Sequence, residues 1–117
     1  MPSILLVDDQ PDLLEASRLI LTAEGYAVCC ARNGIEALEH VLHQPPDFLI
    51  TDWMMPEMGG GELCRRIRAQ PALAHLPILV VTAMPPSLLG PADWDDCLIK
   101  PVSTGLLLAT VKRLCPP

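Results

Sequence analysis

The segment FLITDWMMPEMGG, residues 48–60, joins a run of apolar residues directly to a carboxylate. Residues 48–51 show no alternation between apolar and polar positions, which is typical of a strand buried on both faces of a parallel sheet. An ionised carboxylate next to such a strand is costly unless another group compensates its charge. Asp52 therefore needs either a compensating cation or a chemical role.

The composition is that of one globular domain: of the 117 residues, 50% are hydrophobic and 19% are charged. We expect residues 1–117 to form a single cytoplasmic domain, because no long apolar span and no signal-peptide pattern is present. The net charge is −6, and the only basic cluster is Arg65, Arg66 and Arg68, which argues against nucleic-acid binding. Five cysteines without a CxxC pair indicate reduced thiols that pack in the core.

Strand-like and helix-like segments alternate five times along the chain. Short apolar runs predict strands at 4–7, 26–31, 48–51, 78–81 and 98–99. Apolar positions at helical spacing predict helices at 11–24, 34–44, from after the glycines at 59–61 to about 69, and 102–114. Asn33 and Ser103 are candidate helix caps. Because parallel neighbours need crossover connections, which are usually helices, this order predicts a doubly wound α/β fold with a five-stranded parallel sheet.

The alternation is interrupted between Thr82 and Lys100. This stretch contains four helix-breaking residues, namely Pro85, Pro86, Gly90 and Pro91. They leave room for only about one helical turn, roughly 3.6 residues. We therefore expect a short or irregular fourth helix.

Polar side chains follow four of the predicted strands: Asp8 and Asp9, then Asp52, Thr82 and Lys100. In a parallel sheet these strand ends share one edge, where ligands are generally bound. Three carboxylates repel one another unless a cation compensates, and Mg²⁺ prefers carboxylate and phosphate oxygens. With that charge screened, a carboxylate oxygen can attack a phosphoryl donor and form an aspartyl phosphate. Lys100 can pair with the phosphoryl oxygens, and the Thr82 hydroxyl can donate to one of them.

Each of these residues also has a simpler structural interpretation. Asp9 could cap the first helix, and Lys100 could be a solvated surface charge. Thr82 could be an ordinary strand residue whose hydroxyl bonds to the backbone. The coincidence of all five positions at strand ends favours one shared site.

Four segments together resemble the response-regulator receiver domains of two-component signalling, over essentially the full length: ILLVDDQ at 4–10, DFLITDWMMPEMGG at 47–60, PILVVTA at 77–83 and LIKP at 98–101. The resemblance implies a flavodoxin-like fold with strand order 2-1-3-4-5. It implies that Asp52 is the phosphoacceptor. It also implies a Mg²⁺ (or Mn²⁺) site built from Asp8, Asp9, Asp52 and the backbone carbonyl of Met54.

The resemblance further implies phosphate contacts from Thr82, the backbone N–H of Ala83 and Lys100, with a cis peptide bond before Pro101. The implied partners are a sensor histidine kinase or a phosphotransfer protein as donor, and a downstream protein that responds to altered contacts. Such a domain assists its own phosphorylation and dephosphorylation and is not a turnover enzyme. A free-standing receiver and a receiver within a longer regulator or hybrid kinase both stay open.

Two departures from the family pattern affect the expected switch. Cys97 replaces the aromatic residue that receivers carry three positions before the lysine, so the usual rotamer switch cannot operate. The proline-bearing segment 84–96 alters the same face, where many receivers dimerise. We therefore hypothesise that switching uses the loop after Asp52, which contains Trp53, Met54 and Met58, or uses Trp94.

Two other functions remain as alternatives. Cys97 and the degenerate fourth helix would also suit a phosphorylation-independent, receiver-like interaction module. A haloacid-dehalogenase-like hydrolase would need a second acid two residues after the nucleophile, where this chain has Met54. Nucleotide hydrolysis is excluded because the chain has no G-x-x-x-x-G-K-[ST] loop.

Overall fold

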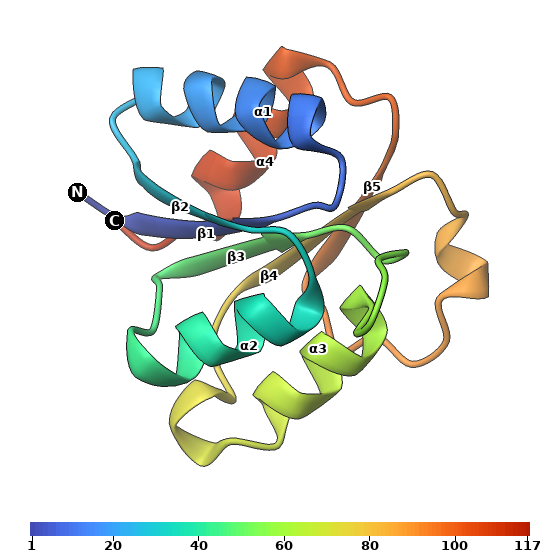
Figure 1. Cartoon of the computed structure of the whole chain (residues 1–117). Coiled ribbons are helices and arrows are strands. Elements are labelled where there is room, and N and C mark those ends of the chain that lie inside the picture. The colour runs from blue at the N-terminus through green and yellow to red at the C-terminus, as the bar shows by residue number, and fades with distance from the viewer.

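Five strands form one parallel sheet with β3 at its centre (Figure 1). The computed structural model describes all 117 residues. The strands are β1 (Ser3–Val7), β2 (Ala27–Ala31), β3 (Phe48–Thr51), β4 (Ile78–Thr82) and β5 (Asp96–Ile99). Their order across the sheet is β2-β1-β3-β4-β5, which confirms the predicted doubly wound, flavodoxin-like arrangement.

Helices cover both faces of the sheet (Figure 1). One face carries α1 (Pro11–Ala23) and α4 (Thr104–Leu114), and the other carries α2 (Gly34–His43) and α3 (Gly60–Arg68). Two short 3-10 turns, η1 (Pro71–Leu73) and η2 (Pro86–Leu88), complete the chain. No helix is both long enough and apolar enough to cross a membrane.

The central strand β3 is buried on both faces, as its sequence predicts. Leu49 packs into the apolar cluster under α2 and α3, whereas Phe48 and Ile50 pack into the cluster under α1 and α4. All four residues of the strand are buried. Alternate side chains of a strand point to opposite faces, and both faces are covered here. The strand therefore contains no position at which a polar side chain would meet solvent.

Both predicted helix caps are confirmed. The Asn33 side chain accepts a hydrogen bond of 2.8 Å from the backbone N–H of Glu36 at the start of α2. The Ser103 hydroxyl accepts one of 3.1 Å from the N–H of Leu106 at the start of α4. Helix α4 consequently begins at Thr104, two residues later than the predicted start.

Two further element boundaries differ from the prediction. Strand β5 begins at Asp96, two residues early, because Asp96 and Cys97 pair with β4 through their backbones although they do not form an apolar run. Helix α3 begins at Gly60, inside the run of glycines, whereas the sequence predicts a start after Gly61. A Cβ at Gly60 would lie 2.2 Å from the carbonyl oxygen of Asp52, so the first turn of α3 can approach β3 only with glycine there.

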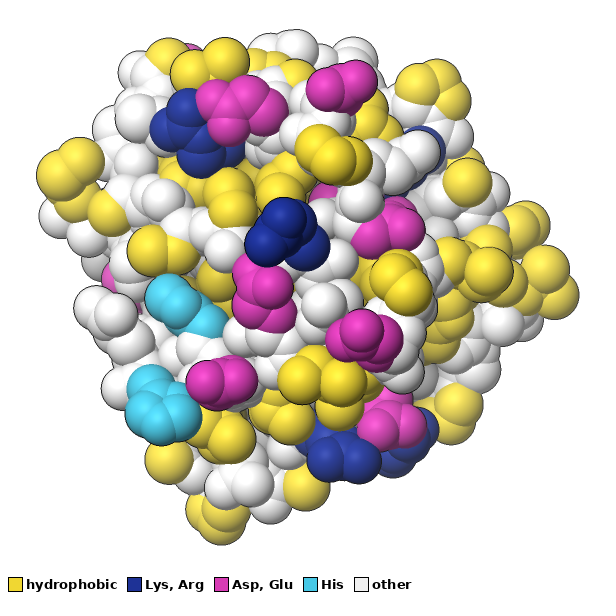
Figure 2. Space-filling model, viewed as in Figure 1, with side chains coloured by type: hydrophobic (Ala, Val, Ile, Leu, Met, Phe, Trp, Pro, Cys, Tyr) yellow, Lys and Arg dark blue, Asp and Glu magenta, His cyan; other side chains and the backbone are white.

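The segment between β4 and β5 contains only the single turn η2, which confirms the predicted short fourth helix. The segment projects from the sheet edge, and hydrophobic side chains gather over it (Figure 2). Arg68 of α3 anchors its far end: Nε donates to the carbonyl oxygen of Asp93 at 2.9 Å, and Nη2 donates to Asp95 Oδ2 at 3.2 Å. The same Asp95 oxygen accepts the backbone N–H of Ile78 at 2.7 Å. Arg68 therefore joins this segment to α3 and to the start of β4.

The cysteines occupy different environments, and none forms a disulfide. The prediction of core thiols is correct for Cys64, which is fully buried in α3. It is wrong for Cys29 and Cys30, which are exposed because β2 is an edge strand of the sheet. An edge strand has a neighbour on one side only, so part of its length stays in contact with water.

Burial of Cys64 predicts a loss of stability at alkaline pH. Burial raises the pKa of this thiol to about 12, above its ordinary value of 9.0. Because the folded pKa is the higher one, the stabilisation is complete below pH 9 and is lost as the pH rises toward 12. We expect the free energy of unfolding of the wild type to fall by on the order of 2–4 kcal/mol more than that of Cys64→Ala over this range.

Urea unfolding followed by circular dichroism between pH 8 and pH 12 measures this difference. Cys29→Ala, which changes an exposed thiol, serves as the matched control and should keep the wild-type slope. If the free energy of unfolding fell with pH equally in the wild type and in Cys64→Ala, the raised pKa of Cys64 would be contradicted.

Candidate functional site

Three carboxylates meet at the carboxyl edge of the sheet. Asp8 and Asp9 follow β1, and Asp52 follows β3, the strand beside it. The last residues of these strands, Val7 and Thr51, are paired in the sheet, so the acids that follow them lie side by side. One oxygen from each of the three carboxylates lies within 4.8 Å of the others. The structure thus brings together acids that are separated by more than forty positions in the sequence.

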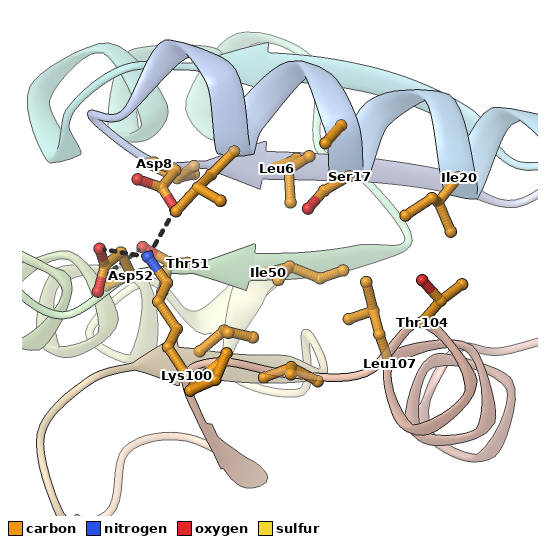
Figure 3. Close-up of a pocket in the computed structure, with 16 residues that line it drawn as sticks. Leu6, Asp8, Ser17, Ile20, Ile50, Thr51, Asp52, Lys100, Thr104 and Leu107 are labelled. Atoms are coloured by element: carbon orange, nitrogen blue, oxygen red, sulfur yellow. Dashed lines mark hydrogen bonds and ion pairs between the residues drawn. The ribbon is translucent and has the colours of Figure 1, made fainter.

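Lys100 bridges two of these carboxylates (Figure 3). Its Nζ lies 2.9 Å from Asp8 Oδ2 and 3.0 Å from Asp52 Oδ2. Lys100 follows β5, and its backbone N–H donates to the carbonyl oxygen of Thr82 at 2.8 Å, which fixes the base of the side chain. The three charged side chains are only 10–19% exposed. Burial alone would lower the pKa of Lys100, but the hydrogen bonds and charges of Asp8 and Asp52 outweigh it and raise the pKa.

The remaining carboxylate oxygens are oriented by the backbone. Asp8 Oδ1 accepts the N–H of Gln10 at 2.9 Å, and Asp52 Oδ1 accepts the N–H of Trp53 at 2.7 Å. The alternative that Asp9 caps the first helix is therefore wrong, because Gln10 is the N-cap residue and no side chain caps that helix. Asp9 is exposed at the rim of the cluster. Its carboxylate is thus free to face a ligand at this edge.

The formal charge of the cluster favours a further cation. Three carboxylates and one ammonium group leave a net charge of −2, and all of these groups except that of the exposed Asp9 are largely buried. Oxygen donors of this kind suit hard divalent ions such as Mg²⁺ or Mn²⁺. The donor set therefore fits the metal that the sequence predicts at this position.

The loop after Asp52 is held from two sides. The N–H of Gly60 donates to the carbonyl oxygen of Trp53 at 2.8 Å, and the N–H of Gly34 donates to the carbonyl oxygen of Met58 at 2.9 Å. A Cβ at Gly34 would lie 2.4 Å from that Met58 oxygen, so only glycine allows the contact. Sequence reasoning missed the role of Gly34. Its position directly after the cap Asn33 was the only available signal.

Other predicted site residues lie near the cluster without bonding to it. Thr82 ends β4 and is buried, but its hydroxyl accepts the N–H of Met84 at 3.3 Å and makes no hydrogen bond to the acids. Ala83 is exposed directly after it. The Met54 side chain is 63% exposed. The Lys100–Pro101 peptide bond is cis, as the resemblance implies.

Cys97, which replaces the aromatic of the family, and Trp94 of the hypothesised switch are both half-buried. Cys97 and Trp94 both pack against the apolar cluster under α2 and α3. The indole N–H of Trp94 is buried and has no hydrogen-bond acceptor. The switch hypothesis for these residues and for Trp53 stays a prediction.

Comparison with known proteins identifies the family. The family model of the response regulator receiver domain matches residues 4–112. This chain belongs to the response-regulator receiver family. It is 40% identical over 118 residues to the phosphate regulon transcriptional regulatory protein PhoB of Rhizobium meliloti, covering 97% of this chain and 52% of PhoB. It is 39% identical over 117 residues to the sensor histidine kinase TmoS of Ectopseudomonas mendocina, covering 97% of this chain and 12% of TmoS.

A solved receiver structure agrees closely with the fold. The response regulator protein TrrA of Thermotoga maritima, crystallised in complex with Mg²⁺ and BeF, superposes with a TM-score of 0.89 at 32% identity, covering 97% of this chain and 98% of TrrA. The chain is therefore a receiver domain with the phosphoacceptor role of two-component signalling. The phosphorylation-independent module is not favoured. The chain spans about half the length of PhoB and a small part of TmoS.

The bridging position of Lys100 predicts a measurable effect on stability. Lys100→Met keeps most of the aliphatic stem but leaves Asp8 and Asp52 facing each other without a cation. We expect the free energy of unfolding to fall by about 1–3 kcal/mol in urea at pH 7 without divalent metal. Since the pKa of Lys100 is raised above its ordinary value of 10.5, this difference should persist up to that pH and disappear above it.

Lys112→Met removes an exposed lysine of α4 and is the matched control. It should change the free energy of unfolding by less than about 0.5 kcal/mol. Equal stabilities of the two variants would show that the bridge between Asp8 and Asp52 does not stabilise the fold.

Proposed function

We propose that Asp52 is the residue that accepts the phosphoryl group. The observation that carries this proposal is the position of its carboxylate beside the acids of β1 and in contact with Lys100 from β5. Asp52 follows the central strand β3, which lies between β1, followed by the other two acids, and β4, which ends at Thr82. Asp9 is exposed and makes no ion pair, which suits a metal ligand better than a nucleophile.

In the proposed reaction a carboxylate oxygen of Asp52 forms a bond to phosphorus. The bond between phosphorus and the donor nitrogen or oxygen breaks, and its electron pair leaves with the donor. Lys100 pairs with an oxygen of the incoming phosphoryl group, while Thr82 and the N–H of Ala83 donate to the others. The Thr82 hydroxyl accepts the N–H of Met84 in this structure, and its own hydrogen stays free to donate to the phosphoryl group.

The acids Asp8, Asp9 and Asp52, with the backbone carbonyl of Met54, are the proposed ligands of Mg²⁺ or Mn²⁺. The grouping of three carboxylate oxygens within 4.8 Å supports this assignment. The complex of TrrA with Mg²⁺ and BeF supports it further. A bound divalent ion neutralises charge that otherwise repels a phosphoryl donor.

The proposed donor is a sensor histidine kinase or a phosphotransfer protein in the cytoplasm. Receiver sequences similar to this one occur in a transcriptional regulator, PhoB, and in a sensor histidine kinase, TmoS. The response would pass to a downstream protein through altered contacts, without direct binding of nucleic acid by residues 1–117. On this proposal the single domain promotes its own phosphorylation and dephosphorylation and turns over no external substrate.

Phosphorylation of Asp52 can be tested by intact-mass spectrometry. We expect one added phosphoryl group after incubation with Mg²⁺ and acetyl phosphate, and none after the same treatment with EDTA. Asp52→Asn should show no adduct, whereas Asp47→Asn, which changes an exposed acid before β3, should be phosphorylated like the wild type. An unmodified but folded wild-type protein would overturn the proposal.

Met54 predicts a long-lived phosphorylated form. Its apolar, exposed side chain two positions after Asp52 cannot orient a water molecule for attack on the phosphoryl group. We expect Met54→Asn, which adds a hydrogen-bonding amide, to shorten the half-life of the phosphorylated protein by roughly tenfold, less than the roughly hundredfold or more of a true general base, because an amide can orient water but cannot take its proton. Loss of the mass adduct with time gives the rate. Met54→Leu should decay like the wild type, and equal rates for all three proteins would contradict the prediction.

A further inference from the structure

A cavity of about 280 Å³ lies between α1 and α4, beside the acid cluster (Figure 3). Leu6 and Ile50 form its floor on the sheet, and Ser17 and Ile20 of α1 face Leu107 of α4 across it. We call it the α1/α4 cavity. Its volume is just below the range of small-molecule pockets, roughly 300–1000 Å³. It extends the edge of the sheet that holds Asp52 into an apolar space.

Small side chains on the facing helices account for this cavity. Ala16 and Ser17 lie on the side of α1 that faces α4, and Thr104 begins α4 opposite them. None of these side chains is large enough to fill the space above the sheet. On the opposite face, by contrast, Leu63 and Ile67 of α3 are fully buried in a cluster that continues across β1, β3 and β4. The two faces of the sheet are therefore filled to different degrees.

The cavity opens to solvent along one side. Leu13 is 44% exposed, and the lining residues Ala16, Pro101 and Thr104 are also exposed. A small molecule can therefore enter without displacing a helix. At the carboxyl edge of the sheet the cavity is bounded by Asp8, Asp52 and Lys100 (Figure 3).

The charges at this end of the cavity determine which kind of ligand it favours. Asp8 and Asp52 carry two negative charges against the one positive charge of Lys100, and Asp9 lies within 4.8 Å of both acids. Such a cluster attracts a cationic group and repels a carboxylate or phosphate. The remaining lining offers mainly apolar contacts. A cationic head joined to a short apolar chain complements both parts of the cavity.

We propose that the α1/α4 cavity binds small primary alkylammonium ions, with the ammonium group at the carboxylates of Asp8 and Asp52 and the alkyl chain along Leu6, Ile50 and Leu107. The volume equals that of roughly nine water molecules. A chain of about six carbons therefore fits. The ammonium group occupies the region of the acids that the proposed divalent metal needs, so the two cations compete. Binding of the amine itself requires no phosphorylation and goes beyond the phosphoacceptor function.

Isothermal titration calorimetry on the full chain, freed of divalent metal, tests the ligand class. We expect hexylammonium to bind tenfold or more tightly than butylammonium, because each buried methylene contributes roughly fourfold in affinity. Hexanoate, which has the same length and the opposite charge, should bind at least tenfold more weakly than hexylammonium. Added Mg²⁺ should weaken hexylammonium binding in a competitive manner. Equal affinity for hexylammonium and methylammonium, or for hexylammonium and hexanoate, would overturn the proposal.

A second experiment locates the ligand. Ser17→Leu fills the cavity with a good helix former and should weaken hexylammonium binding at least tenfold. Thr22→Leu makes a matched change on an exposed position of the same helix, away from the cavity, and should bind like the wild type. Circular dichroism verifies the fold of each variant, and Ala16→Leu replaces Ser17→Leu if that protein does not fold. Wild-type affinity in the folded cavity variant would show that the ligand binds elsewhere.

Discussion

The contact of Lys100 with Asp8 and Asp52 is the interaction on which this edge of the sheet depends. The parallel order β1, β3, β4, β5 places two carboxylates next to each other, and neither could stay largely buried and ionised without a nearby cation. Lys100 supplies that cation from a position 92 residues after Asp8 in the sequence. The cation compensates only part of the negative charge. The residual charge makes the edge receptive to a divalent ion, and through it to a phosphoryl group.

The two faces of the sheet support this edge in different ways. On the α2/α3 face, glycines at 34 and 60 bring helix starts against the loop after Asp52, so the backbone around the acid is held closely. On the α1/α4 face, small side chains leave an apolar cavity that reaches Asp52 from the other side. The site thus combines a carboxylate whose backbone is closely held with an accessible space beside that carboxylate. Because the α1/α4 face contains a cavity and the α2/α3 face is closely packed, a movement of the Asp52 side chain toward α4 displaces fewer neighbouring atoms than one toward α3.

Much of this arrangement follows from the sequence because it depends on local patterns. Apolar runs define the strands, Asn33 and Ser103 define helix starts, and the order of elements places the acids and Lys100 at one edge. The contacts that were not predicted are those that a side chain or a backbone N–H makes to carbonyl oxygens of other parts of the chain. Arg68 binds carbonyl oxygens of the chain after η1 and before β5, and Gly34 binds that of Met58. The exposure of Cys29 and the α1/α4 cavity likewise depend on which elements lie at an edge and on how fully neighbouring helices fill a face.

Under the proposed function, the segment between β4 and β5 is a route by which a signal would leave the site although Cys97 replaces the aromatic of the family. Its beginning is held by the weak 3.3 Å bond from the N–H of Met84 to the Thr82 hydroxyl, and its end is held by several bonds from Arg68. Under the proposed function the Thr82 hydroxyl donates to the phosphoryl group, and a shift of its side chain toward that group would lengthen the bond from the N–H of Met84. Only the beginning of the segment is then released, because the contacts of Arg68 do not involve Thr82. Movement would therefore be confined to the exposed hydrophobic turn η2 and its neighbours, with no need for an aromatic side chain on β5.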